Sequence, residues 1–258
     1  MKKFGLFLIS FFLTVLILAP AFGQIAKIVD VKGDVTVRKD ANVSWQKAKP
    51  DMYLANEAEI RTGTSSECTL TFDEELDNMM TIKGDSHIKM EDVGGGKIYL
   101  PKGRVFSLIE DLAKLKDFQV RTPTAIAGVK GTGEEVIVNG TTTVNCFEGK
   151  AYAQGLDKSG KKGSKKDITK GFGIIVFVGG GLGDIFDLDR GSWADWFDFR
   201  DFIRGIRWPG TNRERRDRVN KILGEGKEDH KEKDFEKEFR YNSHIKNGEY
   251  YTIESPGY

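Results

Sequence analysis

Short segments in which apolar and polar residues alternate make up most of this chain, and glycine-rich turns separate them. Alternation of this kind places every second side chain on one face of an extended strand, so each segment can bury one face. AKIVDVKGDVTVRK, SECTLTF and EEVIVNG are examples, rich in the valine, isoleucine and threonine that favour strands. Only EDLAKLKD interrupts the series with a short helical pattern. The sequence therefore predicts a single, mainly β domain over residues 24–182, built as a sandwich, a roll or a short β-solenoid.

The first 23 residues have the layout of a secretory signal peptide. A basic MKK start precedes an apolar run from Phe4 to Leu18, and small Ala21 and Gly23 stand before the cut that we expect ahead of Gln24. The alternative is an uncleaved membrane anchor, for which the apolar run is short. We therefore expect an exported protein, periplasmic or secreted, that keeps no transmembrane helix after cleavage.

Two cysteines, Cys68 and Cys146, lie on the apolar faces of predicted strands. In an oxidising compartment they could form a disulfide, and closing so long a loop would stabilise the fold by about 4 kcal/mol in the chain-entropy model. Two buried thiols are an equal alternative, because the sequence does not show whether the two strands are neighbours.

The stretch RTPTAIAGVKGTGEEVIVNG, residues 121–140, has glycines spaced as in either a phosphate-binding loop or a tight corner. A phosphate loop needs Gly-Lys-Ser/Thr at the start of a helix, and the dinucleotide-binding motif needs a βαβ unit. Here the glycines lead into a β-branched strand instead. We interpret the stretch as a structural corner: Pro123 fixes its entry, and Gly128 and Gly131 permit a positive φ or a close backbone approach. Thr132 can hydrogen-bond to its own turn.

This stretch, together with VNCFEGKAYA after it, resembles the FecR-like periplasmic domain, whose hallmark is a Thr-Pro, Ala/Gly-rich, Arg-Gly-Thr corner. VKGDVTVRK, EIRTGTSSECTLTF, HIKM and KIYLPKGRVFSLI fit the same pattern, so the resemblance covers residues 25–177 and is densest over residues 118–152. A lysine stands where the family usually has arginine, and Glu134 stands where an aromatic residue is common. The positions that correspond to the family corner are Thr122, Pro123, Gly128, Lys130, Gly131 and Thr132.

The resemblance implies a non-catalytic protein. In its name-giving role the family is a transmembrane regulator, whose periplasmic β domain senses an outer-membrane iron transporter and whose cytoplasmic part controls a sigma factor. This chain resembles a standalone secreted form of the β domain. The implied function is a binding or sensing module of the cell envelope. The alternative is an accessory component of FecR-type transmembrane signalling that acts through a membrane-spanning partner.

Six lysines stand among glycine and serine in KSGKKGSKKDITK. The simpler interpretation is a solvated hairpin loop. The alternative is a patch that binds an anionic envelope polymer or lipid headgroups. The formal net charge of the whole chain is only +1, so nothing indicates a nucleic-acid partner. The lysines are Lys158, Lys161, Lys162, Lys165, Lys166 and Lys170.

Residues 183–224 change to a helical period, and residues 225–258 form a charged tail that we expect to be flexible or helical. The first helix has Ser192 as its expected N-cap and ends before Pro209, and a second helix runs from Thr211 to Gly224. We expect the aromatic stripe of the first helix to pack on its own domain. Docking of a partner and interfacial membrane contact are the alternatives. The stripe consists of Trp196, Phe199, Ile203 and Ile206.

The sequence contains no motif for catalysis, for a metal or for a cofactor. Its three histidines belong to no zinc motif, and no Ser-His-Asp elbow occurs. Glu134 and Glu135 point to opposite faces of their strand and form no acid–base pair. DLDRGSWADWFD has aspartates at calcium-loop positions but lacks the oxygen ligand at the fifth position and the turn glycine, so a helix start is favoured. We therefore predict a protein that is not an enzyme and uses no cofactor.

Overall fold

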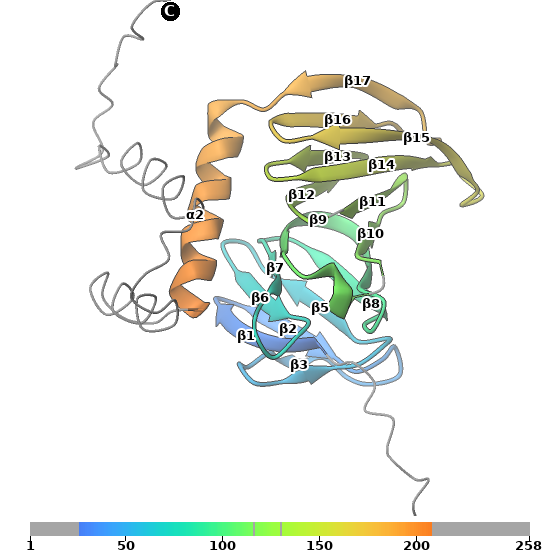
Figure 1. The fold of residues 1–258 in the computed structure, drawn as a ribbon. Helices are drawn as coiled ribbons and strands as arrows, with labels where there is room; N and C mark the ends of the chain where they lie inside the picture. The colour runs from blue at the N-terminus through green and yellow to red at the C-terminus, as the bar shows by residue number, and fades with distance from the viewer. Residues whose placement is uncertain (1–25, 116, 130, 208–258) are drawn as a thin grey trace, which may run out of the picture. The chain divides into compact units, whose positions relative to one another are not determined.

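The structure, a computed structural model, describes residues 26–207 except residues 116 and 130 (Figure 1). The described residues form seventeen strands, one short 3₁₀ helix and one α-helix, which confirms the predicted mainly β fold. The predicted signal peptide, Lys130, the second helix at Thr211–Gly224 and the charged tail lie outside the described residues.

The strands form two sheets that share a single apolar core. In the first, sheet A, all neighbours are antiparallel. Its spatial order is β4 (Tyr53–Leu54), β1 (Ala26–Lys32), β6 (Glu67–Thr71), β7 (Asn78–Ile82), the second half of β9 (Lys97–Ile109), β12 (Thr132–Asn139), β13 (Thr141–Cys146), β16 (Phe172–Val176) and β17 (Leu182–Asp187).

The second sheet, sheet B, has the same number of members and is antiparallel except where β9 and β10 run parallel. Its spatial order is β3 (Gln46–Lys47), β2 (Val35–Arg38), β5 (Glu59–Thr62), β8 (His87–Asp92), the first half of β9, β10 (Gln119–Arg121), β11 (Ala125–Val129), β14 (Lys150–Leu156) and β15 (Lys162–Thr169).

Strand β9 bends at Gly103 and so belongs to both sheets. Residues up to Lys102 pair in sheet B, and residues from Gly103 onwards pair in sheet A. Gly103 has a φ of +105°, and a Cβ added there would collide with the backbone and side chain of Ser86. Only glycine satisfies both the positive φ and this close approach.

The strands of the N-terminal half bend in the same way, and their bends lie together along one edge of the sandwich. Gly63 donates its N–H to the carbonyl of Asp34 at 2.8 Å, and its own carbonyl accepts from the N–H of Asp85 at 3.2 Å. Lys83 donates to the carbonyl of Arg104 at 2.9 Å. These bonds satisfy backbone groups that leave the sheets at the bends. The bends contain Gly33, Gly63, Gly84 and Gly103.

The bends of the C-terminal half lie at the opposite edge. Strand β12 begins opposite Ile109, at the end of β9 that is farthest from Gly103. The bend between β13 and β14 lies beside the start of β12, because Phe147 donates its N–H to the carbonyl of Gly133 at 2.8 Å. The sandwich is therefore closed along one edge in its N-terminal half and along the other edge in its C-terminal half. The glycines at these later bends are Gly131, Gly149 and Gly171.

Replacing Gly103 with alanine is expected to lower the free energy of unfolding by roughly 2 to 4 kcal/mol, because the methyl group meets Ser86 and the φ is positive. Urea denaturation of the purified protein measures the change. The matched control is Gly205→Ala in the α-helix, where nothing lies within 4 Å of the added Cβ. That variant is expected to be about 0.5 to 1 kcal/mol more stable. Equal stability of the two variants would contradict the role of the bend.

Helix α2 (Arg190–Arg207) packs on the outer face of sheet A, the face away from the shared core (Figure 1). Trp196, Phe199 and Ile203 of the predicted stripe are buried, and Ile206 is partly buried against them. These helix residues pack against apolar side chains on the outer face of sheet A, namely Met79, Phe106, Leu108 and Phe147. The expected N-cap was wrong: the helix starts two residues before Ser192, and Oδ1 of Asp189 accepts the N–H of Ser192 at 2.7 Å.

Candidate functional site

The predicted corner around residues 121–140 consists of two turns at opposite edges of the sandwich. Thr122 and Pro123 lie in the turn between β10 and β11, whereas Gly131 lies in the bend between β11 and β12 and has a φ of +74°. Gly128 lies between them on β11, where an added Cβ would collide with the ring of Tyr152. The stretch therefore positions strands at both ends of β11, and Thr132 begins β12.

The Thr122 turn is held by buried hydroxyl groups. Oγ1 of Thr122 accepts the N–H of Ala125 at 2.9 Å and lies 2.7 Å from Oγ1 of Thr142 on β13. Oγ1 of Thr124 is also 2.7 Å from that Thr142 oxygen. These three threonines are buried, so their bonds connect sheet B to sheet A inside the fold and have no access to a ligand.

Cys68 and Cys146 are free, buried thiols and form no disulfide. Cys68 lies on β6 and Cys146 on β13, and β7, β9 and β12 separate these strands in sheet A. Four strand spacings amount to about 19 Å, far more than the Cα separation that a disulfide allows. The disulfide alternative is thus not realised. Burial raises the pKa of each thiol to about 12, which keeps both protonated.

A thiol count checks this arrangement. The native protein is expected to react very slowly with a chromogenic disulfide reagent, because both thiols are buried and protonated. The denatured protein, without reductant, is expected to release two thiols per chain. No reactive thiol after denaturation would show a disulfide and contradict the order of strands in sheet A.

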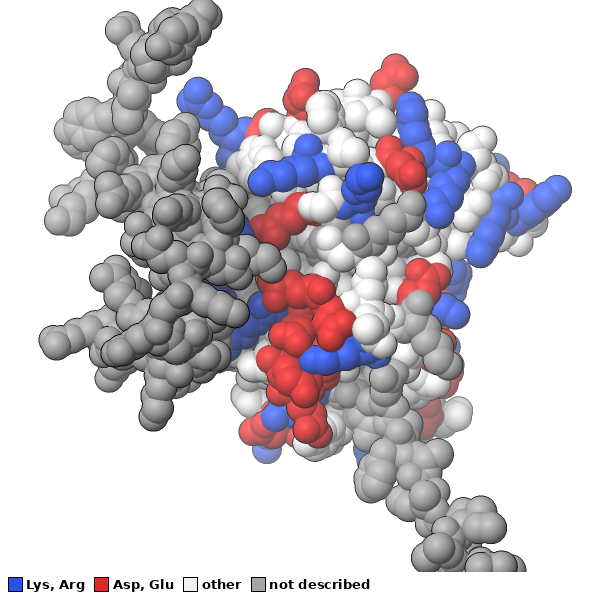
Figure 2. Space-filling view, in the orientation of Figure 1, with Lys and Arg blue, Asp and Glu red and all other residues white. Residues whose placement is uncertain are grey.

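The six predicted lysines do not form one cluster. Five of them lie on the β14–β15 hairpin, and Figure 2 shows blue side chains gathered where Figure 1 places these two strands. Lys170 lies at the other end of β15, about 17 Å from Lys165 along the strand. All except the half-buried Lys166 are exposed. The described carboxylates form no ion pair with these side chains, and Nζ of Lys165 lies 3.4 Å from the ring centre of Tyr152.

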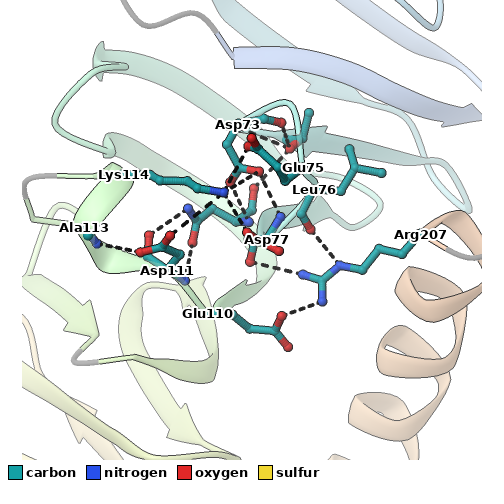
Figure 3. Close-up of polar contacts among 11 residues, drawn as sticks. Asp73, Glu75, Leu76, Asp77, Glu110, Asp111, Ala113, Lys114 and Arg207 are labelled. Atoms are coloured by element: carbon teal, nitrogen blue, oxygen red, sulfur yellow. Dashed lines mark hydrogen bonds and ion pairs between the residues drawn. The ribbon is translucent and has the colours of Figure 1, made fainter. Parts of the chain in front are cut away.

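An acidic loop surrounds Lys114 at the end of the β6–β7 hairpin (Figure 3). Nζ of Lys114 lies 2.6 Å from Asp77, 3.0 Å from Glu75 and 4.0 Å from Asp73. Hydrogen bonds to Asp77 and Glu75 raise the pKa of Lys114, so it remains charged. The acidic group, red in Figure 2, is thus neutralised in part by its own lysine. We therefore interpret it as a structural cluster that fixes this loop.

Arg207 connects the acidic loop to the end of α2 (Figure 3). Its Nε donates to the carbonyl of Leu76 at 2.6 Å, and Nη2 donates to that of Asp77 at 3.1 Å. Its Nη1 lies 2.6 Å from Glu110. Residues 26–207, apart from the two omitted positions, contain no group of three His, Cys, Asp or Glu side chains suited to a metal ion.

Glu134 and Glu135 point to opposite faces of β12. Glu135 faces α2, where it pairs with Arg104 and accepts from Nδ2 of Asn145 at 2.7 Å. Glu134 faces the core, is fully buried, and has no hydrogen-bond partner for either oxygen. Burial raises its pKa to about 8. The hydroxyl of Ser107, directly opposite on β9, is also unpartnered. The two carboxylates form no acid–base pair.

Two exposed apolar residues lie in the stretch GFGIIVFVGGGLGDIF, whose apolar run followed by glycines is typical of a buried strand and a turn. Ile174 and Val176 of β16 are buried, but Phe177 is 50% exposed and Val178 is 64% exposed at the tip of the β16–β17 hairpin. The glycine run directly after them was the available signal, because it ends the strand before the alternation can bury either residue.

The described part of the chain contains no helix long and apolar enough to cross a membrane. Residues 58–152 match the family model described as FecR protein. The comparison with curated proteins finds no match. Two crystal structures of a candidate anti-sigma factor from Parabacteroides distasonis are similar to this chain, each with 16% sequence identity and a TM-score of 0.43. The similarity covers 54% of this chain and 64% or 63% of the other, less than two thirds of that protein.

Proposed function

We propose that this protein, which belongs to the FecR family through residues 58–152, is a non-catalytic binding or sensing module of the cell envelope. The family match supports a role related to signalling. The predicted signal peptide supports export to the periplasm or the exterior, where such a module would meet envelope components.

The exposed lysines next to the FecR region carry the proposal. The matched region ends within β14, and β15 pairs directly with β14. The lysine side chains on this hairpin have no described carboxylate partner, so their charge remains available to an anionic envelope component. The second candidate function is an accessory role in FecR-type signalling through a membrane-spanning partner, which the family match favours.

A capture experiment in the native cells tests the proposal and separates the two candidates. The tagged full-length chain is expressed, cross-linked in intact cells and recovered under denaturing conditions. Recovery of peptidoglycan or another anionic envelope component supports the binding module. Recovery of a transporter or a transmembrane regulator supports the signalling role. A chain that is recovered from the cytoplasm, or that turns over a substrate, would overturn the proposal.

A further inference from the structure

Two hairpin tips lie side by side at one edge of the C-terminal half. A Cβ added to Gly180, in the β16–β17 turn, would lie 2.8 Å from the backbone of Leu156 at the end of β14. A Cβ added to Gly155 would collide with the carbonyl oxygen of Gly180. Leu156 pairs with Lys162 across the β14–β15 hairpin. The β16–β17 tip is therefore packed against the lysine-bearing β14–β15 tip.

The β16–β17 tip exposes two consecutive apolar side chains on a closed turn. Phe177 donates its N–H to the carbonyl of Gly181 at 2.8 Å, and Gly180 donates to the carbonyl of Phe177 at 2.9 Å. Half of Phe177 and 64% of Val178 are exposed, although the preceding Val176 is fully buried. The two adjacent side chains form a small exposed apolar patch, and such a patch can mark a site of contact with a membrane or another protein.

The β14–β15 tip next to it is basic and held by its own turn. Oδ1 of Asp157 accepts the N–H of Ser159 at 2.8 Å, the hydroxyl of Ser159 at 2.6 Å and the N–H of Lys161 at 2.9 Å. The hydrogen bond from the Ser159 hydroxyl has the largest effect in lowering the pKa of Asp157, and the backbone N–H groups add to it. Together these bonds hold the carboxylate within the turn. The nearby lysines, exposed and without a described carboxylate partner, are Lys158, Lys161, Lys162 and Lys165.

We propose that the two tips together dock on an anionic lipid bilayer, with Phe177 and Val178 entering the interface and the four lysines contacting lipid phosphates. This inference rests on the proposed envelope function and names its partner. An apolar residue beside a basic cluster supplies the two signals that stable membrane binding needs. A polyanionic glycan would use the lysines but would leave Phe177 and Val178 in water, so the exposed apolar tip favours the bilayer.

Flotation with lipid vesicles tests the inference on the full chain. We expect binding to vesicles of phosphatidylcholine mixed with phosphatidylglycerol, weak binding to phosphatidylcholine alone, and a decrease as salt is added. Each Lys→Gln change at Lys158, Lys162 or Lys165 is expected to lower the affinity about fivefold. The double change Phe177→Ser and Val178→Ser is expected to lower it about tenfold or more.

Matched controls lie in the same two hairpins but away from their tips. Lys170→Gln changes a lysine at the far end of β15, and Ile185→Ser changes a residue of β17 that is 40% exposed but lies away from the tip. Both are expected to keep the affinity within about twofold. Thermal unfolding of every variant checks that the sandwich is intact.

The outcomes separate this inference from the proposed function. If the Phe177 and Val178 changes leave the binding to vesicles unaltered, the bilayer inference fails. The envelope function still stands in that case if the lysine changes abolish the binding of the chain to peptidoglycan or to an anionic glycan. If the chain binds neither vesicles nor envelope polymers, and captures no envelope protein, both fail.

Discussion

Glu134→Gln is expected to remove most of the pH dependence of stability between about pH 5 and pH 8. The side chain is fully buried without a hydrogen-bond partner, and burial raises its pKa from 4.5 to about 8. In this range the folded state retains a proton that the unfolded state has released. The free energy of unfolding therefore falls as the pH rises, by up to about 1.4 kcal/mol per pH unit.

Above pH 8 the folded protein carries the full cost of a buried carboxylate, about 4 to 5 kcal/mol relative to pH 4. Urea denaturation of both proteins at a series of pH values gives the difference curve. We expect the variant to gain on the parent protein steadily from about pH 5 and to level off above pH 8. Parallel curves for the two proteins would show that the carboxylate is neither buried nor neutral in the fold.

Trp196→Ala is expected to destabilise the fold by about 3 to 5 kcal/mol or to release α2 from sheet A. The indole is fully buried, and its ring lies parallel to that of Phe147 with 4.8 Å between centres. It also rests on Gly133, where a Cβ would collide with it. Removing the indole leaves a cavity among aromatic rings that cannot all close around it.

Denaturation measures the total loss, and amide hydrogen exchange shows whether residues of α2 lose protection before the strands do. The matched control is Phe202→Ala on the same helix, which is 38% exposed and is expected to cost less than about 1 kcal/mol. If Trp196→Ala were as mild as the control, α2 would not be anchored by its aromatic stripe.

The β fold and the helix could be predicted because both depend on local periodicity. Strands such as β6 and β12 follow the alternation seen in the sequence, and the stripe of α2 follows the spacing of Trp196, Phe199 and Ile203. Periodicity does not show at which residue a strand or helix begins or ends. The last strand continues to Asp187. Asp189 and Ser192 are both good N-cap residues and lie three positions apart, so the sequence pattern alone does not select between them. In the structure Asp189 is the cap, because its carboxylate accepts the N–H of Ser192.

Pairing between distant strands could not be predicted. Which strand lies beside β6 or β13 depends on long-range register, so the sequence left the pairing of Cys68 with Cys146 undecided. The same limit explains the corner residues. Thr122 and Gly131 are nine positions apart in the sequence, and β11 carries them to opposite edges. The lysine patch was predicted as a unit, but the length of β15 separates Lys170 from it.

Export is the premise of the proposed function, and the N-terminus of the protein recovered from its native cells tests it most directly. Mass spectrometry of the purified chain, with fractionation of the cells, identifies both the first residue and the compartment. We predict a chain that begins at Gln24 and is recovered from the periplasm or the medium. A chain that keeps Met1 and remains in the cytoplasm would contradict the account.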